Sequence, residues 1–511
     1  MRYFAPMISR LRFYWVVTVC GGVLMALEIL SSRVLAPHFG NSVYVWGSII
    51  SVFLAALSLG YLLGGRLADR QPSLAALGRL LALAAACLAV LQVFSAPVAA
   101  RLGALTGGAP SGTLLATAVL FGPASVLLAT VSPWAVRLAA RDLGALGKTA
   151  GQLFAFSTLG SLGGTLAATF LLIPFLDLRQ TLALLTALTA FTAAFALTAQ
   201  WRLERPALFL SAALLVGAFV AGNWAPHRSP ELLYERVSPY QSIEVRDIEG
   251  VRRLVSDRVT QATVSLTDRE PTFPYIRAVP VAYLLKPDLK TALFIGLGGG
   301  SAGRYLTSRV PDLQVDYVEI DPAIDEVARK YFYFQPNPRL TITIEDGRAF
   351  LSRSTRKWDF IFCDAYIGQS VPFHLTTLQF LEEVKRHLNP GGVFGLNLAA
   401  GLEDPFSQAM YRTVRERFAT IHLFLPQRAP NILAMATPEA VTLPPGGFLE
   451  RARELDRRYR LDPSFVQLAL QRGEVSLDAQ KAQILSDEFA PVDRLIRLGE
   501  EARAAEAAKP R

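Results

Sequence analysis

Glycines and acidic residues follow four short apolar runs in the second half of the chain, and these residues have the clearest capacity for chemistry. The first run, TALFI, leads into the glycine-rich segment GLGGGS at residues 296–301, directly before a helical stretch. Glycines let the backbone approach a ligand closely, and the free N–H groups at a helix N-terminus attract polar groups. We therefore predict ligand contacts at Gly296, Gly298 and Gly300. On its own, such a loop suits NAD, FAD or an adenosyl ligand equally.

The ends of the next three apolar runs make the ligand prediction more specific. Glu319 ends the second run about twenty residues further on, a spacing that suits hydrogen bonds to ribose hydroxyl groups. Asp346 and Gly347 follow the third run, where an acid can reach an adenine amino group, and Asp364 and Tyr366 follow the fourth. Ligands of open α/β sheets bind outside the carboxyl ends of the strands, so the four loops together indicate one adenosyl-ligand site. The alternative role for each acid is that of a helix N-cap.

The elements that position these residues are predicted from the alternation of apolar and helical segments. From Lys290 onward, short apolar runs alternate with helical stretches, a pattern typical of a mostly parallel sheet covered by helices. Before it, residues 240–265 alternate apolar and polar side chains around a Glu-Gly turn and predict a small β hairpin. The tail from about residue 446 has a helical, charged composition. The second half is therefore predicted to be an α/β domain with a small N-terminal β element.

The first half of the chain has the composition of a membrane protein. The chain is 52% hydrophobic and only 18% charged, and the excess of apolar residues lies in the first 225 positions. A bilayer core requires roughly 20 apolar residues per helix. We therefore expect a multi-pass protein of the cell (inner) membrane, with the lipid bilayer as a partner. About seven transmembrane helices are predicted, near residues 13–34, 43–65, 78–100, 113–136, 151–175, 180–199 and 207–224.

Domain boundaries and several exclusions follow from the same composition. The predicted parts are a transmembrane domain (1–224), a linker (225–238), a catalytic domain (239–500) and a flexible tail (501–511). Much of the net charge of +9 lies in short loops between apolar runs, which favours membrane topology over nucleic-acid binding. The three cysteines and five histidines have no disulfide or metal-ligand spacing, so we expect no metal.

The distribution of basic residues conflicts with the expected number of spans. If the N-terminus is cytoplasmic, most lysines and arginines near the spans lie on the cytoplasmic side, and the opposite loops carry only Arg33, Arg101 and Arg179. The positive-inside rule therefore favours a cytoplasmic N-terminus. Seven spans would then place the α/β domain outside, where adenosyl donors are not expected. The sequence alone leaves the side of the soluble domain unresolved.

The order of the motifs resembles the spermidine synthase, or polyamine aminopropyltransferase, family, and more closely its membrane-fused bacterial branch with an N-terminal transmembrane domain. The resemblance runs from Tyr240 to about Ala399. It implies a Rossmann-like domain of the class I methyltransferase type behind the small β element. The matching positions, in chain order, are Tyr240, Gln241, Asp257, Gln261, Tyr275, the glycine-rich loop, Glu319, Asp346 and Asp364.

The resemblance implies transfer of an aminopropyl group from decarboxylated S-adenosylmethionine to a small-molecule amine, with methylthioadenosine as the leaving product. Asp364 would accept a proton from the amine, and decarboxylated or intact S-adenosylmethionine would be the co-substrate. A homodimer is left open. The residues implied for the co-substrate are Gln241, Gly296, Gly298, Gly300, Glu319, Asp346 and Gly347. Those implied for the acceptor are Gln261, Tyr275, Tyr366 and His374, with packing at a helix start as the alternative for His374.

The chain departs from the family at positions that hold cationic amines. Gly299 stands where the family's glycine loop has an aspartate, and Ile367 stands where the family has a second acid beyond the base. Ile276 and Arg277 replace a His-Glu pair. These differences weaken the expectation of a diamine such as putrescine. Two other functions therefore stay open: another S-adenosylmethionine-dependent reaction such as methyl transfer, and a non-catalytic adenosyl-ligand-binding membrane protein.

Overall fold

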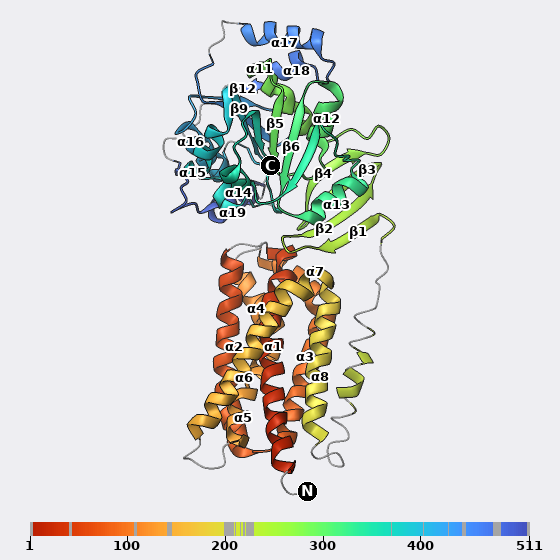
Figure 1. Ribbon diagram of the computed structural model, residues 1–511, viewed down its shortest axis with the longest axis vertical. Helices are drawn as coiled ribbons and strands as arrows, with labels where there is room; N and C mark the ends of the chain where they lie inside the picture. Colours follow the sequence, from red (N-terminus) through yellow and green to blue (C-terminus); the bar gives the residue numbers. More distant parts are fainter. Residues whose placement is uncertain are drawn as a thin grey trace. The chain divides into compact units, whose positions relative to one another are not determined.

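The chain forms two compact units in the computed structural model (Figure 1). The first comprises Met1–Arg228 with Val237–Pro239, and the second comprises Ser229–Arg236 with Tyr240–Arg511. The structure describes residues 4–39, 43–106, 110–139, 146–198, 229–368, 370–401, 403–427, 429–441, 446–473 and 482–507, and isolated positions between 209 and 220.

The first unit is helical and contains the predicted membrane spans. Six of its described helical segments are long and apolar enough to cross a bilayer, and they correspond to the first six predicted spans. The predicted seventh span, 207–224, lies outside the described residues apart from isolated positions. The helices are α1 (Phe4–Phe39), α2 (Val43–Arg70), α3 (Leu74–Thr106), α4 (Pro110–Ala129), α5 (Val131–Ala139), α6 (Leu146–Ala167), the π-helical η1 (Ala168–Leu172), α7 (Ile173–Phe175) and α8 (Leu178–Leu197).

Helices α1 and α6 pack with their backbones in contact. A Cβ added to Gly160 would lie 2.0 Å from the carbonyl oxygen of Thr18, and one added to Gly164 would lie 2.1 Å from that of Gly22. Small residues at helix interfaces allow this close approach when lipid surrounds the helices, because packing rather than the hydrophobic effect then drives association. The glycines of α6 therefore have a packing role within the helical unit.

The second unit begins with a four-stranded antiparallel sheet in the order β1-β2-β3-β4. Two-residue turns with positive φ join β2 to β3 at Glu249-Gly250 and β3 to β4 at Asp257-Arg258, as tight hairpins require. The predicted hairpin and its Glu-Gly turn are thus correct. The predicted linker 225–238 is wrong in part, because residues 232–237 form the edge strand β1, which pairs with β2. The strands are β1 (Leu232–Val237), β2 (Ser242–Ile248), β3 (Val251–Ser256) and β4 (Val259–Ser265).

An eight-stranded sheet follows, in the order β12-β10-β11-β9-β8-β5-β6-β7. Strands β5 to β9 run parallel to one another, and β11 pairs antiparallel with β9 and with β10, which in turn pairs antiparallel with β12. This is the predicted Rossmann-like arrangement. The strands are β5 (Thr291–Ile295), β6 (Gln314–Glu319), β7 (Leu340–Ile344), β8 (Trp358–Cys363), β9 (Leu388–Leu398), β10 (Thr420–Phe424), β11 (Ile432–Thr437) and β12 (Arg472–Gly473).

Helices cover both faces of this sheet, which explains the continuous apolar runs of its strands (Figure 1). All residues of β8, for example, are buried. Helix α19 continues to Ala507, so part of the predicted flexible tail 501–511 is helical. The helices are α10 (Pro274–Ala278), η3 (Val279–Val281), α11 (Ala282–Leu285), α12 (Ser301–Arg309), α13 (Pro322–Tyr331), α14 (Gly347–Arg353), η4 (Phe373–Leu375), α15 (Leu378–Arg386), α16 (Pro405–Arg415), α17 (Gly447–Arg458), α18 (Phe465–Ala469) and α19 (Val492–Ala507).

The strand order reverses direction between β5 and β8. The chain runs outward from β5 through β6 to β7 and then returns to the other side of β5 as β8. Ile295 pairs with both Val318 and Cys363, so the carboxyl ends of β5, β6 and β8 lie level with one another. In open α/β sheets, such a switch point opens a crevice that binds ligands.

Candidate active site

A cavity of about 650 Å³ opens at this edge of the large sheet. Its walls come from the loops that follow β5, β6, β7 and β8, from β4, and from the segment around α10. Every site residue predicted from the sequence except Gly300 lines the cavity. These residues are Gln241, Gln261, Tyr275, Gly296, Gly298, Glu319, Asp346, Gly347, Asp364, Tyr366 and His374.

The glycine-rich loop after β5 owes its shape to positive φ angles and close contacts. Gly296 has a φ of 98°, and a Cβ there would lie 2.3 Å from the carbonyl oxygen of Asp364. Gly300 has a φ of 65° and precedes α12, and a Cβ there would lie 2.4 Å from the ring of Phe334. Gly300 therefore shapes the loop without lining the cavity, and Gly296 brings the loop against the strand end that carries Asp364.

The Glu319 carboxylate holds the glycine-rich loop from the end of β6. One oxygen accepts a 2.9 Å hydrogen bond from the N–H of Leu297, and the other accepts one of 2.9 Å from the N–H of Asp321. Burial raises the pKa of Glu319 to about 7, although these backbone bonds oppose the rise. Each carboxylate oxygen can accept a second bond, so hydroxyl groups of a ligand can still bind here. Glu319 is not a helix N-cap, since Asp321 caps α13.

Gln241 reaches the same region from the loop before β2. Its Nε2 donates to Asp321 at 3.3 Å, and its Oε1 accepts a hydrogen bond from the Ser256 hydroxyl. The side chain is buried and lines the cavity. Gln241 therefore links the small sheet to the end of β6 beside the glycine-rich loop.

Asp346 is the N-cap of α14, as the alternative for it proposed, and it also lines the cavity. One oxygen caps α14 by accepting hydrogen bonds from the N–H groups of Arg348 and Ala349, at 3.0 and 2.9 Å. The other lies 2.9 Å from Nε2 of His374, in η4. The hydrogen bond with His374 lowers the pKa of Asp346, and the backbone bonds add to this effect. Both side chains line the cavity, so His374 at the start of a short helix is also a cavity residue.

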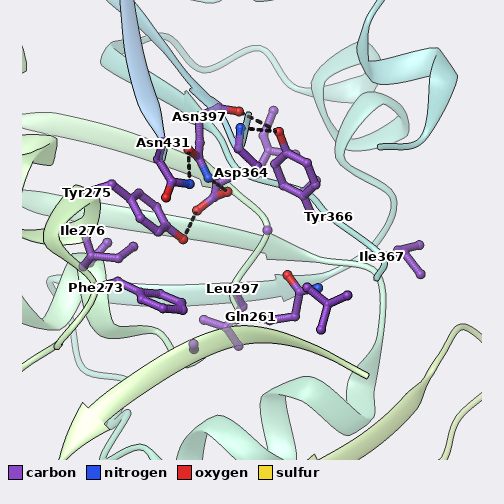
Figure 2. A pocket seen from close by; sticks show the side chains of 18 of the residues that line it. Gln261, Phe273, Tyr275, Ile276, Leu297, Asp364, Tyr366, Ile367, Asn397 and Asn431 are labelled. Carbon is purple, nitrogen blue, oxygen red and sulfur yellow. Dashed lines mark hydrogen bonds between the residues drawn. The ribbon is translucent and has the colours of Figure 1, made fainter. Parts of the chain in front are cut away.

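Asp364 lies at the end of β8 with its carboxylate held by two neutral donors. Oδ1 accepts a hydrogen bond of 2.8 Å from Nδ2 of Asn397, and Oδ2 accepts one of 3.1 Å from the hydroxyl of Tyr275 (Figure 2). Burial raises the pKa of Asp364, and the two bonds limit the rise. The carboxylate keeps further acceptor capacity toward the cavity. Its bonds are to these side chains, not to helix N–H groups as in an N-cap.

Two asparagines that the sequence did not reveal extend this arrangement. Asn431 donates through Nδ2 to Oδ1 of Asn397 at 3.0 Å, which fixes the direction in which the Asn397 amide faces Asp364 (Figure 2). The Tyr366 hydroxyl donates to the Asn397 carbonyl at 2.9 Å and accepts from the Ala399 N–H at 3.2 Å. Asn397 is 3% exposed. Its only sequence signal is a lone polar residue in an apolar run.

Of the other residues discussed for the acceptor amine, some line the cavity and one lies away from it. Nε2 of Gln261 donates to the carbonyl of Gly368 at 2.8 Å and so ties β4 to the loop after β8. Ile276 and Ile367 both line the cavity. Arg277 instead forms a salt bridge and a 2.9 Å hydrogen bond with Asp462, away from the cavity lining.

Comparisons with known proteins give several similarities. The spermine/spermidine synthase domain matches residues 277–424. A polyamine aminopropyltransferase of Vibrio vulnificus (strain CMCP6) is 33% identical over 280 residues, which cover 52% of this chain and 91% of that protein. An N-terminal histidine N-methyltransferase of Emericella nidulans is 34% identical over 146 residues, or 28% of this chain and 25% of that protein. A probable spermidine synthase structure from Corynebacterium glutamicum ATCC 13032 has a TM-score of 0.41 and 19% identity, and covers 52% of this chain and 99% of that one.

The strand order and the cavity at the carboxyl edge define a Rossmann-like domain of the methyltransferase type. The match with the Vibrio protein covers nearly all of that protein, so it identifies the family as well as the fold. The chain belongs to the polyamine aminopropyltransferase, or spermidine synthase, family, and it is a transferase of that type. Its activity is accordingly aminopropyl transfer of the spermidine-synthase kind. The fusion to a membrane domain is suggested by the six apolar helices alone.

Proposed function

We propose that the α/β unit binds decarboxylated S-adenosylmethionine in this cavity and transfers its aminopropyl group to an amine, with Asp364 as the base. The observation that carries the proposal is the Asp364 carboxylate, held by Tyr275 and Asn397 beside the glycine-rich loop. Glu319 and Asp346 supply acceptors suited to ribose hydroxyls and to an adenine amino group.

In the proposed reaction, the amine nitrogen forms a bond to the aminopropyl carbon next to the sulfonium. The bond from that carbon to sulfur breaks, its electron pair neutralises the sulfonium, and methylthioadenosine leaves. The amine loses a proton, which Asp364 accepts. Because burial raises the pKa of Asp364, its carboxylate is a stronger base than an exposed aspartate. Tyr275 and Asn397 keep that carboxylate pointed at the cavity, which supplies the orientation that the transfer requires.

A second candidate is methyl transfer from intact S-adenosylmethionine. The identity with the Emericella N-methyltransferase favours it, although that match covers only a quarter of the relative. The test uses the full-length protein in detergent micelles, each sulfonium donor and a panel of amines. Methylthioadenosine is the expected product, and the Asp364→Asn variant should release far less of it. Release of adenosylhomocysteine, with no methylthioadenosine from any amine, would replace the first candidate by the second.

We further propose that the protein is a multi-pass membrane protein with its α/β unit on the cytoplasmic side. Among the described residues, six helices are long and apolar enough to cross a bilayer, and six spans would return the chain to the side of the N-terminus, for which the positive-inside rule favours the cytoplasm. A crossing by residues 207–224 would reverse that side. A reporter fused after Arg511 should therefore show cytoplasmic activity. A reporter active only outside the cell would establish a seventh crossing.

A further inference from the structure

The cavity extends to both sides of Asp364, which ends the central strand β8. On one side lie the ends of β5, β6 and β7, with the glycine-rich loop, Glu319 and Asp346. On the other side lies β9, and residues 399–401 directly after it also line the cavity. Since the proposed donor binds on the first side, the β9 side is the part of the cavity that the acceptor can occupy.

A chain of contacts leads from Asp364 into the β9 side and ends near a second carboxylate, that of Asp404. Asn397 donates to Asp364, and the Tyr366 hydroxyl joins the carbonyl of Asn397 to the N–H of Ala399 (Figure 2). Burial raises the pKa of the Tyr366 hydroxyl, and the charges of Asp364 and Asp404 both add to the rise. Tyr366 is therefore within electrostatic range of both carboxylates, and Asp404 also lines the cavity.

The carboxylate of Asp404 is buried and has a cation as its partner. One oxygen caps α16 by accepting from the N–H groups of Phe406 and Ser407, each at 3.1 Å. The other forms a 2.9 Å salt bridge with Arg503 of α19. The side chain of Asp404 is only 4% exposed, and an unpaired carboxylate at such a site is strongly unfavourable. This position of the cavity lining therefore favours a positive charge.

Arg503 is a cation that can be exchanged. Its side chain lines the cavity but is 53% exposed, so the guanidinium can turn into solvent without becoming a buried, unpaired charge. Helix α19 has other attachments that would remain. Asp493 accepts a 2.8 Å hydrogen bond from the Ser370 hydroxyl, and a Cβ at Gly499 would lie 1.9 Å from the Asp404 carboxylate, so the helix backbone packs directly against it.

We propose that Asp404 determines acceptor specificity: its carboxylate binds the far ammonium group of a diamine, which displaces Arg503 into solvent. This inference rests on the proposed function. The near amine lies at Asp364, and the carbon chain crosses the small residues 399–401. One cation replaces another, so the charge of Asp404 stays paired throughout. Asp404 thereby supplies an acid for the amine from a different element, where positions 299 and 367 have none.

The first test removes the charge of Asp404 and keeps its cap. Asp404→Asn retains a good N-cap residue for α16. Methylthioadenosine release by the full-length protein is compared for 1,4-diaminobutane and 1-aminopentane, which have equal length and differ in the far ammonium. We expect wild-type kcat/KM to be at least about tenfold higher for the diamine, and Asp404→Asn to lower this ratio at least about tenfold. Equal wild-type values, or an unchanged ratio in Asp404→Asn of normal melting temperature, would overturn the inference and leave aminopropyl transfer intact.

The second test removes the competing cation, and its expected sign differs from that of a purely structural salt bridge. Arg503→Met should lower KM for the diamine about threefold, because a half-exposed salt bridge is weak but must be broken, and should leave KM for 1-aminopentane unchanged. The gain should vanish when Asp404→Asn is added.

Arg494→Met is the matched control, since Arg494 is an exposed arginine of α19 that does not line the cavity. It removes the same charge and should change neither KM. A diamine KM in Arg503→Met that is unchanged or higher, or a decrease that Arg494→Met reproduces, would contradict the exchange. Failure of every amine tested to release methylthioadenosine would instead overturn the proposed function.

Discussion

Replacement of Asp364 by asparagine gives the sharpest test of the proposed base. The substitution keeps the shape of the side chain. Its oxygen can still accept from Nδ2 of Asn397, and its new NH2 group can face the Tyr275 hydroxyl, which can accept as well as donate. Both hydrogen bonds at Asp364 therefore have counterparts in the variant. The group that takes a proton from the amine is the one feature that is lost.

The expected magnitudes differ strongly between rate and stability. Loss of a general base typically slows a reaction by about 10² to 10⁴. We expect turnover to fall at least about a hundredfold, which corresponds to about 2.7 kcal/mol in the barrier. The stability should change by no more than about 1 kcal/mol, because the variant also removes a buried charge and retains its partners. Donor affinity should stay within a few-fold of the wild-type value, since Glu319 and Asp346 are unchanged.

The assay measures donor binding by calorimetry, melting temperature and single-turnover release of methylthioadenosine on the same preparation. Asp359→Asn is a matched control, since Asp359 is a buried acid at the opposite end of β8 whose carboxylate accepts from the N–H groups of Lys290 and Thr291. The control should melt earlier but keep its turnover. If Asp364→Asn behaves like this control, Asp364 is a structural residue and the mechanism has lost its base.

Two pH-dependent predictions follow from the same site. The hydroxyl groups of the donor bind the charged form of Glu319, whose pKa is about 7, so donor affinity should increase as pH rises through about 7 and binding should release protons in calorimetry. Glu319→Gln should abolish this pH dependence. Glu319→Ala should weaken donor binding at least about tenfold. The second prediction concerns the asparagines and is tested by the pH dependence of the pre-steady-state rate. Asn397→Leu removes a hydrogen-bond donor to the charged form of Asp364, so the pKa of Asp364 should rise and the acidic limb of the profile should move to higher pH. Asn431→Ala should move this limb by less. A normal donor affinity in Glu319→Ala would show that Glu319 does not bind the donor. An unchanged acidic limb in Asn397→Leu would exclude Asn397 as a partner of the base.

The position of the glycine-rich loop, Glu319 and Asp346 around the cavity was predictable because their signals are local in the sequence. A strand followed by glycines, and strands that end at Glu319 and Asp346, can be recognised without knowledge of tertiary contacts. The parallel sheet then brings these ends level with one another, as the pairing of Ile295 with Val318 and Cys363 shows. Their arrangement around one cavity follows directly from the βαβ pattern.

The partners of Asp364 could not be predicted because they depend on pairings between distant strands. Asn397 faces Asp364 because β9 lies beside β8, and Asn431 precedes the antiparallel strand β11, which pairs with β9 on its other side. Each is a single polar residue next to apolar segments, so composition alone does not distinguish it from a turn residue. The extra strand β1 and the extension of α19 were missed for the same reason. An edge strand gains its order from β2, and α19 is fixed by contacts such as the salt bridge between Arg503 and Asp404.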